Sequence, residues 1–174
     1  MNSMLEFLSL AQIIGYLAFV LGVGSFLQMS DRHFKLWMTA ECIAYAVHFY
    51  LLGNPTAVAS TLVSASRSII SMYTRSLWLA WMIVLVNIGF GILFVKQPAD
   101  ALPLIASSIA TLGLFRLQGI RMRFVLLCGT LLWLANNLIA GSIGGTALEA
   151  VVAAVNLSTM VRMYRESRLK NEAA

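Results

Sequence analysis

Charged residues are scarce in this sequence: Asp, Glu, Lys and Arg together make up 11% of its 174 residues, whereas hydrophobic residues make up 60%. A soluble domain carries about 25% charged residues and uses them to cover its water-facing surface. This chain cannot cover such a surface, which excludes an ordinary soluble protein and predicts that most of it faces lipid. We therefore interpret the net charge of +5 as an orientation signal for membrane helices, and we expect no nucleic-acid partner.

Cysteine and histidine are also rare. Cys42 and Cys128 lie in apolar runs without CxxC spacing, so we interpret both as packing residues. No Lys or Arg precedes the first apolar run, which argues against a signal peptide and predicts a first membrane helix. The sequence has two histidines and no HExxH or GK[ST] motif, so we expect no enzyme, no metal and no cofactor.

Long apolar stretches dominate what remains. A membrane-spanning helix needs about 17–25 mostly apolar residues, and helices satisfy their backbone hydrogen bonds within the bilayer. The sequence therefore predicts a single all-α integral membrane domain. Its seven predicted spans are Leu10–Gln28, Phe34–Leu52, Thr56–Tyr73, Leu77–Val95, Ala101–Leu117, Arg123–Ala140 and Thr146–Met163.

The basic residues predict how these spans are oriented. Lys96 alone falls on one side of the membrane, Arg67 falls inside a span, and the other ten fall on the opposite side. Those ten are Arg32, Lys35, Arg75, Arg116, Arg121, Arg123, Arg162, Arg165, Arg168 and Lys170. Because cytoplasmic loops are rich in Lys and Arg, the C-terminus is predicted to be cytoplasmic and the N-terminus outside. Residues 164–174 are expected to be a fraying cytoplasmic tail.

The second and third predicted spans resemble the sixth and seventh. Tyr45 falls opposite Trp133 and Gly53 opposite Gly141, both 88 positions apart. After a two-residue insertion in the loop, the third span aligns with the seventh at a spacing of 90 positions. The matched residues are Thr56 and Thr146, Ser68 and Ser158, and Arg75 and Arg165. This pattern predicts two parallel three-helix repeats, residues 10–73 and 101–163, joined by a linker helix at 77–95. Such a 3+1+3 layout occurs in transporters, with the site near mid-membrane between the repeats.

Polar residues inside the spans are the candidate site. Glu41, Tyr45 and His48 share one face of the second span, and Arg67 lies among serines of the third. Glu41 and Arg67 both lie ~10–12 Å from the cytoplasmic ends of their helices, which predicts an ion pair. Because a charge at the bilayer centre costs about 2.5–3.5 kcal/mol, Arg67 should face the bundle. Two interpretations stay open: Arg67 presents its charge to a solute, or it forms a structural pair or reaches the headgroups.

The seventh span supplies two further polar candidates. The letters "TALE" match a capping box, in which Thr146 caps the helix start and Glu149 reaches back to it. Asn156 lies deep in the same span, where it either binds a polar solute or bonds to another helix. For His48 the same choice is open between titration and simple hydrogen bonding.

Several segments resemble a known family. The stretches "HFYLLGNPTAVASTLVSASRSI", "TRSLW", "LPLIASSIATLGLFR", "GIRMR" and "AGSIGGTALEA" resemble the YgjV-type bacterial inner membrane proteins, from about Ile13 to Arg165. The resemblance implies a multi-pass protein of the bacterial inner membrane and carries no biochemical activity with it.

More distantly, the 3+1+3 layout resembles the SWEET, PQ-loop and PnuC-like transporter group. The stretch "SFLQMSDR" is similar to the PQ-loop signature, with Leu27 where that signature has proline. This resemblance implies that Asn156 lies near the solute pocket. The first-repeat counterpart of Asn156 holds Ser66 and Arg67, which favours an anionic or zwitterionic solute over a neutral sugar.

Together these patterns favour a transporter or facilitator of a small polar metabolite. Its central cavity would be lined by Glu41, Tyr45, Arg67 and Asn156, with His48 as a further candidate. The alternative is a non-transporting partner subunit, receptor or assembly protein that uses "TRSLW" and the basic tail for contacts. The expected partners are the lipid bilayer and an unidentified solute, and a homo-oligomer is left open.

Overall fold

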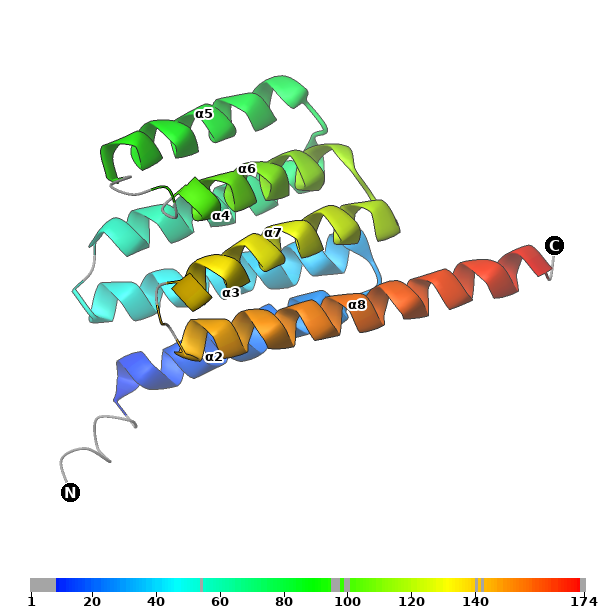
Figure 1. Cartoon of the computed structure of the whole chain (residues 1–174), viewed down its shortest axis with the longest axis horizontal. Coiled ribbons are helices and arrows are strands. Elements are labelled where there is room, and N and C mark those ends of the chain that lie inside the picture. Colours follow the sequence, from blue (N-terminus) through cyan, green and yellow to red (C-terminus); the bar gives the residue numbers. More distant parts are fainter. Residues whose placement is uncertain are drawn as a thin grey trace. The chain divides into compact units, whose positions relative to one another are not determined.

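The computed structural model describes residues 9–53, 55–94, 98, 101–139, 141 and 143–172, and seven α-helices make up the regular structure of this part (Figure 1). They are α2 (Leu10–Leu27), α3 (Asp31–Leu51), α4 (Pro55–Tyr73), α5 (Leu77–Phe94), α6 (Ala101–Arg116), α7 (Gly119–Ile139) and α8 (Ile143–Glu172). Each predicted span coincides with one helix, which confirms the helical fold class.

Three helices extend beyond the predicted spans. The second and sixth predicted spans began at Phe34 and Arg123, whereas α3 begins at Asp31 and α7 at Gly119. The prediction of a fraying tail after residue 163 is wrong, because α8 continues to Glu172. The last turns of α8 are rich in Arg, Glu and Leu, which are good helix formers, so polarity there does not end the helix.

Three described helices are long and apolar enough to cross a membrane: α2, α7, and α8 from Thr146 onward. Leu77–Gly89 in α5 and Ala101–Arg116 in α6 are apolar but shorter. The protein is therefore a helical protein of the membrane type. That all seven helices cross the bilayer, with the N-terminus outside, stays a prediction.

The chain divides into two compact units, Met1–Tyr73 and Thr74–Ala174. In the first unit, α3 packs against both α2 and α4. Helix α2 meets α3 through small residues, because Gly15 faces the His48 ring and Gly22 faces the Glu41 carboxylate. Small residues let two helices approach closely within a membrane. This close approach is what brings the polar face of α3 against α2.

In the second unit, α5, α6, α7 and α8 lie side by side in chain order (Figure 1). Gly129 allows α7 to approach α6, since a Cβ built there would lie 3.4 Å from the carbonyl oxygen of Ala106. Asn87 of α5 donates a long hydrogen bond of 3.5 Å to the carbonyl of Leu104 in α6. The unit is thus a row of helices in which each contacts the next.

The two units repeat the same helix bounds. Helices α3 and α7 each contain 21 residues, and both their first and last residues are 88 positions apart. Gly53 and Gly141, also 88 apart, follow these two helices with φ of 68° and 69°. That left-handed conformation is the usual glycine ending of a helix. Helices α4 and α8 begin 88 positions apart as well.

Burial follows the same spacing through α4 and α8, the last helix of each unit. At an offset of 88, Ser68 falls opposite Asn156 and Ser71 opposite Thr159, and all four are buried. At the offset of 90 predicted from the letters, buried Ser68 would face Ser158, which is exposed. The two-residue insertion is therefore wrong for these helices, because identical letters there do not occupy equivalent positions.

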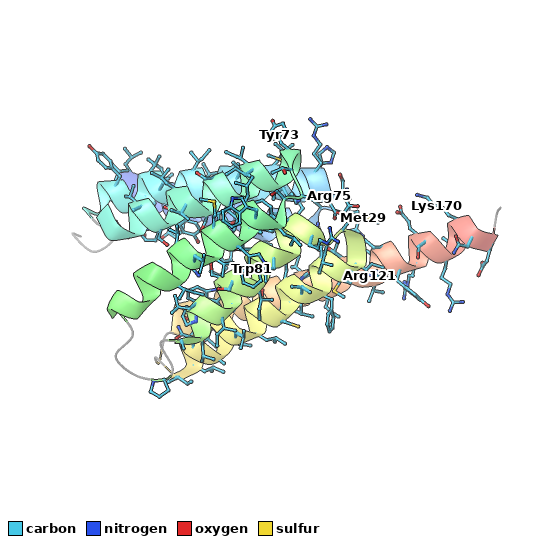
Figure 2. All side chains as sticks on the ribbon, turned by 90° about the horizontal axis from the view of Figure 1, so that it is seen from above. Met29, Tyr73, Arg75, Trp81, Arg121 and Lys170 are labelled. Carbon is cyan, nitrogen blue, oxygen red and sulfur yellow. The ribbon has the colours of Figure 1, made fainter. Side chains whose placement is uncertain are left out.

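Basic residues gather at one end of the second unit. Figure 2 shows Arg75, Arg121 and Lys170 toward the end from which α8 extends, with Trp81 further along α5. Because successive helices alternate in direction, the start of α5 and the α6–α7 turn lie at this end, and the last turns of α8 extend beyond it (Figure 1). Lys96, the one cation predicted on the opposite side, lies outside the described residues, so the sorting of charge between the two sides stays a prediction.

Candidate functional site

In the first unit, Glu41 of α3 and Arg67 of α4 interact electrostatically. Glu41 is half-buried and lies over Gly22, where a Cβ would be 2.8 Å from its Oε1 atom. Arg67 is also half-buried, with its Nε atom enclosed by protein. The carboxylate of α3 therefore faces Gly22 of α2 and interacts electrostatically with the guanidinium of α4.

Tyr45 and His48 continue the polar face of α3 toward the other end of the helix. The Nδ1 atom of His48 lies 2.7 Å from the carbonyl oxygen of Ala11 in α2. Since a carbonyl only accepts, Nδ1 must carry a proton in this contact. The ring of Tyr45 stacks on Phe49, with centroids 5.8 Å apart, and meets the His48 ring edge-on. His48 thereby connects α3 to α2, and Tyr45 belongs to an aromatic group beside it.

The serines around Arg67 differ in their surroundings. Ser68 and Ser71 are buried, whereas Ser60 and Ser66 are exposed. The hydroxyl of Ser71 donates 2.8 Å to the Ser68 carbonyl, and that of Ser66 donates 2.9 Å to Leu62. These two hydroxyls bond to carbonyls of their own helix, as serine side chains within helices often do.

Lys35 is a buried cation that the sequence analysis placed at the cytoplasmic boundary. It lies one turn into α3 with 8% of its surface exposed. Its Nζ atom donates a 2.8 Å hydrogen bond to the carbonyl oxygen of Ser71, in the last turn of α4. The last carbonyls of a helix lack partners within the helix, so the ammonium satisfies one of them and links α3 to α4.

The second unit has its own buried polar centre. Arg123 of α7 and Asn156 of α8 are both 0% exposed. The Nδ2 atom of Asn156 donates a 3.0 Å hydrogen bond to the carbonyl oxygen of Arg123. Its Oδ1 atom is buried and makes no hydrogen bond among the described residues. Asn156 thus bonds to a neighbouring helix and retains an acceptor, so both predicted interpretations stay open for it.

The buried polar residues of the two units follow one plan. Among the described residues there are five in each unit, one from the first helix of a three-helix set and two from each of the others. They are Ser25, Lys35, Thr39, Ser68 and Ser71 in the first unit, and Thr111, Arg123, Thr130, Asn156 and Thr159 in the second. Lys35 and Arg123, the one cation in each set, are 88 positions apart.

A family model described as a bacterial inner membrane protein, Imp-YgjV, matches residues 9–167 of the chain. The protein belongs to the YgjV family. Inner membrane protein YgjV from Escherichia coli (strain K12) is 35% identical over 156 residues, which cover 90% of this chain and 85% of the relative. No solved structure matches the chain. The resemblance to YgjV-type proteins is thereby confirmed, and the protein is placed in the bacterial inner membrane.

In this YgjV-family chain, Thr146 and Glu149 do not form the capping box that the sequence predicted. Helix α8 begins at Ile143, so Thr146 is its fourth residue and cannot cap its start. Glu149 lies in the second turn and is half-buried. The two glycines before Thr146, residues 144 and 145, are helical. The capping interpretation is wrong because the helix absorbs both glycines.

The cations Lys35 and Arg123 are the residues that sequence reasoning missed as parts of the core. Lys35 follows the fully buried Phe34, and Arg123 follows the fully buried Met122. The two dipeptides are 88 positions apart in the sequence. The spacing that matched Tyr45 with Trp133 also matches these cations, so the signal was present. It was not used because Lys35 and Arg123 were interpreted as part of the basic cytoplasmic side that orients the spans.

The described residues hold no group of three His, Cys, Asp or Glu that could bind a metal. What they provide is charge balance and hydrogen bonding inside an apolar bundle. The first unit contains a carboxylate and a guanidinium that interact electrostatically, and the second contains a buried guanidinium and an amide acceptor. Such groups can hold a polar solute or a proton in a YgjV-family protein.

Proposed function

We propose that this YgjV-family protein is a transporter or facilitator of a small polar metabolite with an anionic or zwitterionic character. The two three-helix sets, α2–α4 and α6–α8, would act as parallel repeats with α5 as the linker. The solute would bind in a central cavity between them, and Arg67, Glu41, Tyr45, His48 and Asn156 would line that cavity.

The observation that carries the proposal is the repetition of helix bounds and buried polar positions at one constant spacing of 88. Transporters are commonly built from repeated helical units with the site at the repeat interface. The layout resembles that of the SWEET, PQ-loop and PnuC-like group, which supports the proposal by analogy of architecture alone. No reaction is needed to explain the polar groups.

In this proposal the Glu41–Arg67 pair supplies the selectivity. Arg67 binds the acidic group of the solute in one state and is balanced by Glu41 in the other. Because unpaired charge in a bilayer is costly, exchange between these two partners keeps the guanidinium balanced throughout the cycle. A neutral sugar would offer Arg67 no such exchange.

The test begins with a thermal-shift screen of metabolites on the detergent-purified protein, followed by uptake of each stabilising compound into proteoliposomes. Arg67→Ala and Arg67→Lys should both reduce the shift and the uptake, because the position and geometry of the cation change. Arg32→Ala is the matched control, since Arg32 is an exposed cation at the start of α3. If both Arg67 variants bind and move every stabilising solute like the wild type, the role of Arg67 is wrong.

Cysteine accessibility distinguishes transport from a scaffold or partner role. In a background lacking Cys42 and Cys128, single cysteines would be placed along the Glu41–His48 face of α3. A transporter predicts labelling by membrane-impermeant reagents added from either side. Protection at every position would instead favour a packed, non-transporting membrane partner.

A further inference from the structure

Glu149 is an acidic residue inside an apolar helix that performs no capping role. It lies six residues after the start of α8, which corresponds to ~9 Å along the helix. The next charged residue of α8 is Arg162, thirteen residues further on, or ~20 Å away along the axis. Within its own helix, Glu149 therefore has no nearby charge to balance it.

The helix packed against α8 offers no charge at that level either. Asn156 bonds to Arg123 of α7, and residues seven apart lie on the same helix face. Glu149 thus lies on the α7-facing side of α8, two turns from Asn156. Because α7 and α8 run antiparallel, the residue of α7 level with Glu149 is Thr130. From Phe124 to Ile139, α7 contains no Asp, Glu, Lys, Arg or His, and its one titratable group is the thiol of Cys128.

The nearest cation on α7 is Arg123, at the level of Asn156. It lies two helical turns from the level of Glu149, which is ~10 Å along the helix axis. The other charged residue of α7, Arg121, lies further away still. Glu41 in the first unit differs in this respect, because Arg67 on the neighbouring helix interacts with it electrostatically. The two intramembrane carboxyl groups of the described chain therefore have different surroundings.

Buried polar groups continue from Glu149 toward the basic end of the unit. Thr130, Asn156 and Thr159 are all buried on α7 and α8. The Oδ1 atom of Asn156 is buried and accepts no hydrogen bond among the described residues. Ionisable residues within membrane spans commonly face the bundle interior and mark proton or ion sites. The α7–α8 packing thus contains both a carboxyl group and a line of hydrogen-bonding side chains.

We propose that Glu149 is a reversible proton-binding site of the second unit. Glu149 is half-buried on a side of α8 where α7 and α8 place no cation, and a fixed charge inside an apolar span is costly, so this carboxyl group is suited to bind and release a proton. The ligand is the proton, and the buried side chains of Thr130, Asn156 and Thr159 lie on the same α7–α8 packing. This inference does not depend on transport, because the group would bind a proton whether or not a solute moves.

The test uses dicyclohexylcarbodiimide, an apolar reagent that adds to protonated carboxyl groups in membranes and leaves an N-acylurea. The full-length protein in liposomes would be treated across a pH series, and the modified residue mapped by mass spectrometry. We expect modification of Glu149 that falls about tenfold per pH unit once the ionised form predominates. Glu41 and the exposed Glu166 should remain unmodified.

Two variants make the assignment specific. Glu149→Gln should abolish the modification, and Glu41→Gln should leave it at the wild-type level. Sodium chloride replaced by choline chloride at fixed pH should change nothing if the ligand is a proton. Protection by sodium would overturn the proposal in favour of a metal-cation site, and absence of modification at Glu149 at every pH would overturn it entirely. Neither outcome bears on the solute screen, so the two proposals fail separately.

Discussion

The ammonium of Lys35 in α3 donates a 2.8 Å hydrogen bond to the carbonyl oxygen of Ser71 in α4. In the second unit the direction is reversed, because the amide of Asn156 in α8 donates to the carbonyl of Arg123 in α7. Lys35 and Arg123 are 88 positions apart, as are Ser68 and Asn156. Lys35 and Arg123 thus each join two neighbouring helices, α3 to α4 and α7 to α8, but Lys35 donates through its side chain whereas Arg123 accepts through its backbone carbonyl. The difference follows from α4 ending there while α8 continues.

Replacement of Lys35 by Met should destabilise the protein. The change removes a charged hydrogen bond and leaves a carbonyl without that donor, so we expect a loss of about 1.5–3 kcal/mol. Thermal unfolding in detergent, followed by circular dichroism, measures it. Arg32→Met removes an exposed cation three residues away and should stay within about 0.5 kcal/mol of wild type. Equal stability of the two variants would show that the Lys35 hydrogen bond contributes nothing.

The Glu41–Arg67 interaction can be measured with a double-mutant cycle. Glu41→Gln, Arg67→Gln and the double variant should give a coupling energy of about 0.5–3 kcal/mol, because either single change leaves a charge inside the bundle. Glu166 and Arg162, which are exposed one turn apart on α8, provide the comparison. Their cycle should give about 0.5 kcal/mol or less, because solvent screens an exposed pair. Additive effects of Glu41→Gln and Arg67→Gln would contradict a direct interaction.

Glycine substitutions should separate helix contact from helix propensity. A Cβ at Gly24 would lie 2.5 Å from the Trp37 ring, whereas a Cβ at Gly89 would meet nothing within 4 Å. Gly24→Ala should therefore destabilise by about 1–3 kcal/mol through overpacking between α2 and α3. Gly89→Ala should stabilise α5 by about 0.5–1 kcal/mol, since alanine is the better helix former. Melting temperatures that move in the same direction for both would argue against the close α2–α3 contact.

Asn156→Leu should test the polar centre of the second unit without a large change in volume. We expect a loss of about 1–3 kcal/mol, because the carbonyl of Arg123 loses a buried donor. Ser158→Ala, two residues away on an exposed part of α8, should stay within about 0.5 kcal/mol of wild type. A more stable Asn156→Leu protein would mean that apolar packing outweighs this hydrogen bond.

The helices themselves were predictable from the sequence. Apolar runs such as that of α2 can only be accommodated as helices in a bilayer, and Gly53 and Gly141 marked the ends of α3 and α7. The neighbourhood of Glu41 and Arg67 also followed from helix spacing, because both lie at similar distances from the same ends of two helices joined by a short turn.

Other features depended on contacts that the sequence does not display. Matching letters placed Ser68 opposite Ser158, whereas burial pairs Ser68 with Asn156. Thr146 and Glu149 matched a capping box, yet α8 begins three residues earlier and includes both glycines. In each case the local sequence pattern was present, but it did not predict the structure. The start of the helix decided the capping box, and the packed face of the helix decided which residues are equivalent.

The sequence by itself determined that this is a helical membrane protein, because so few charges cannot cover a water-facing surface. Tertiary structure alone decided which cations enter the core. Lys35 and Arg32 are three residues apart and chemically alike, but only Lys35 points at the end of α4 and finds a carbonyl there. Burial of a charge depends on partners from another helix, and that arrangement is fixed only when the helices pack.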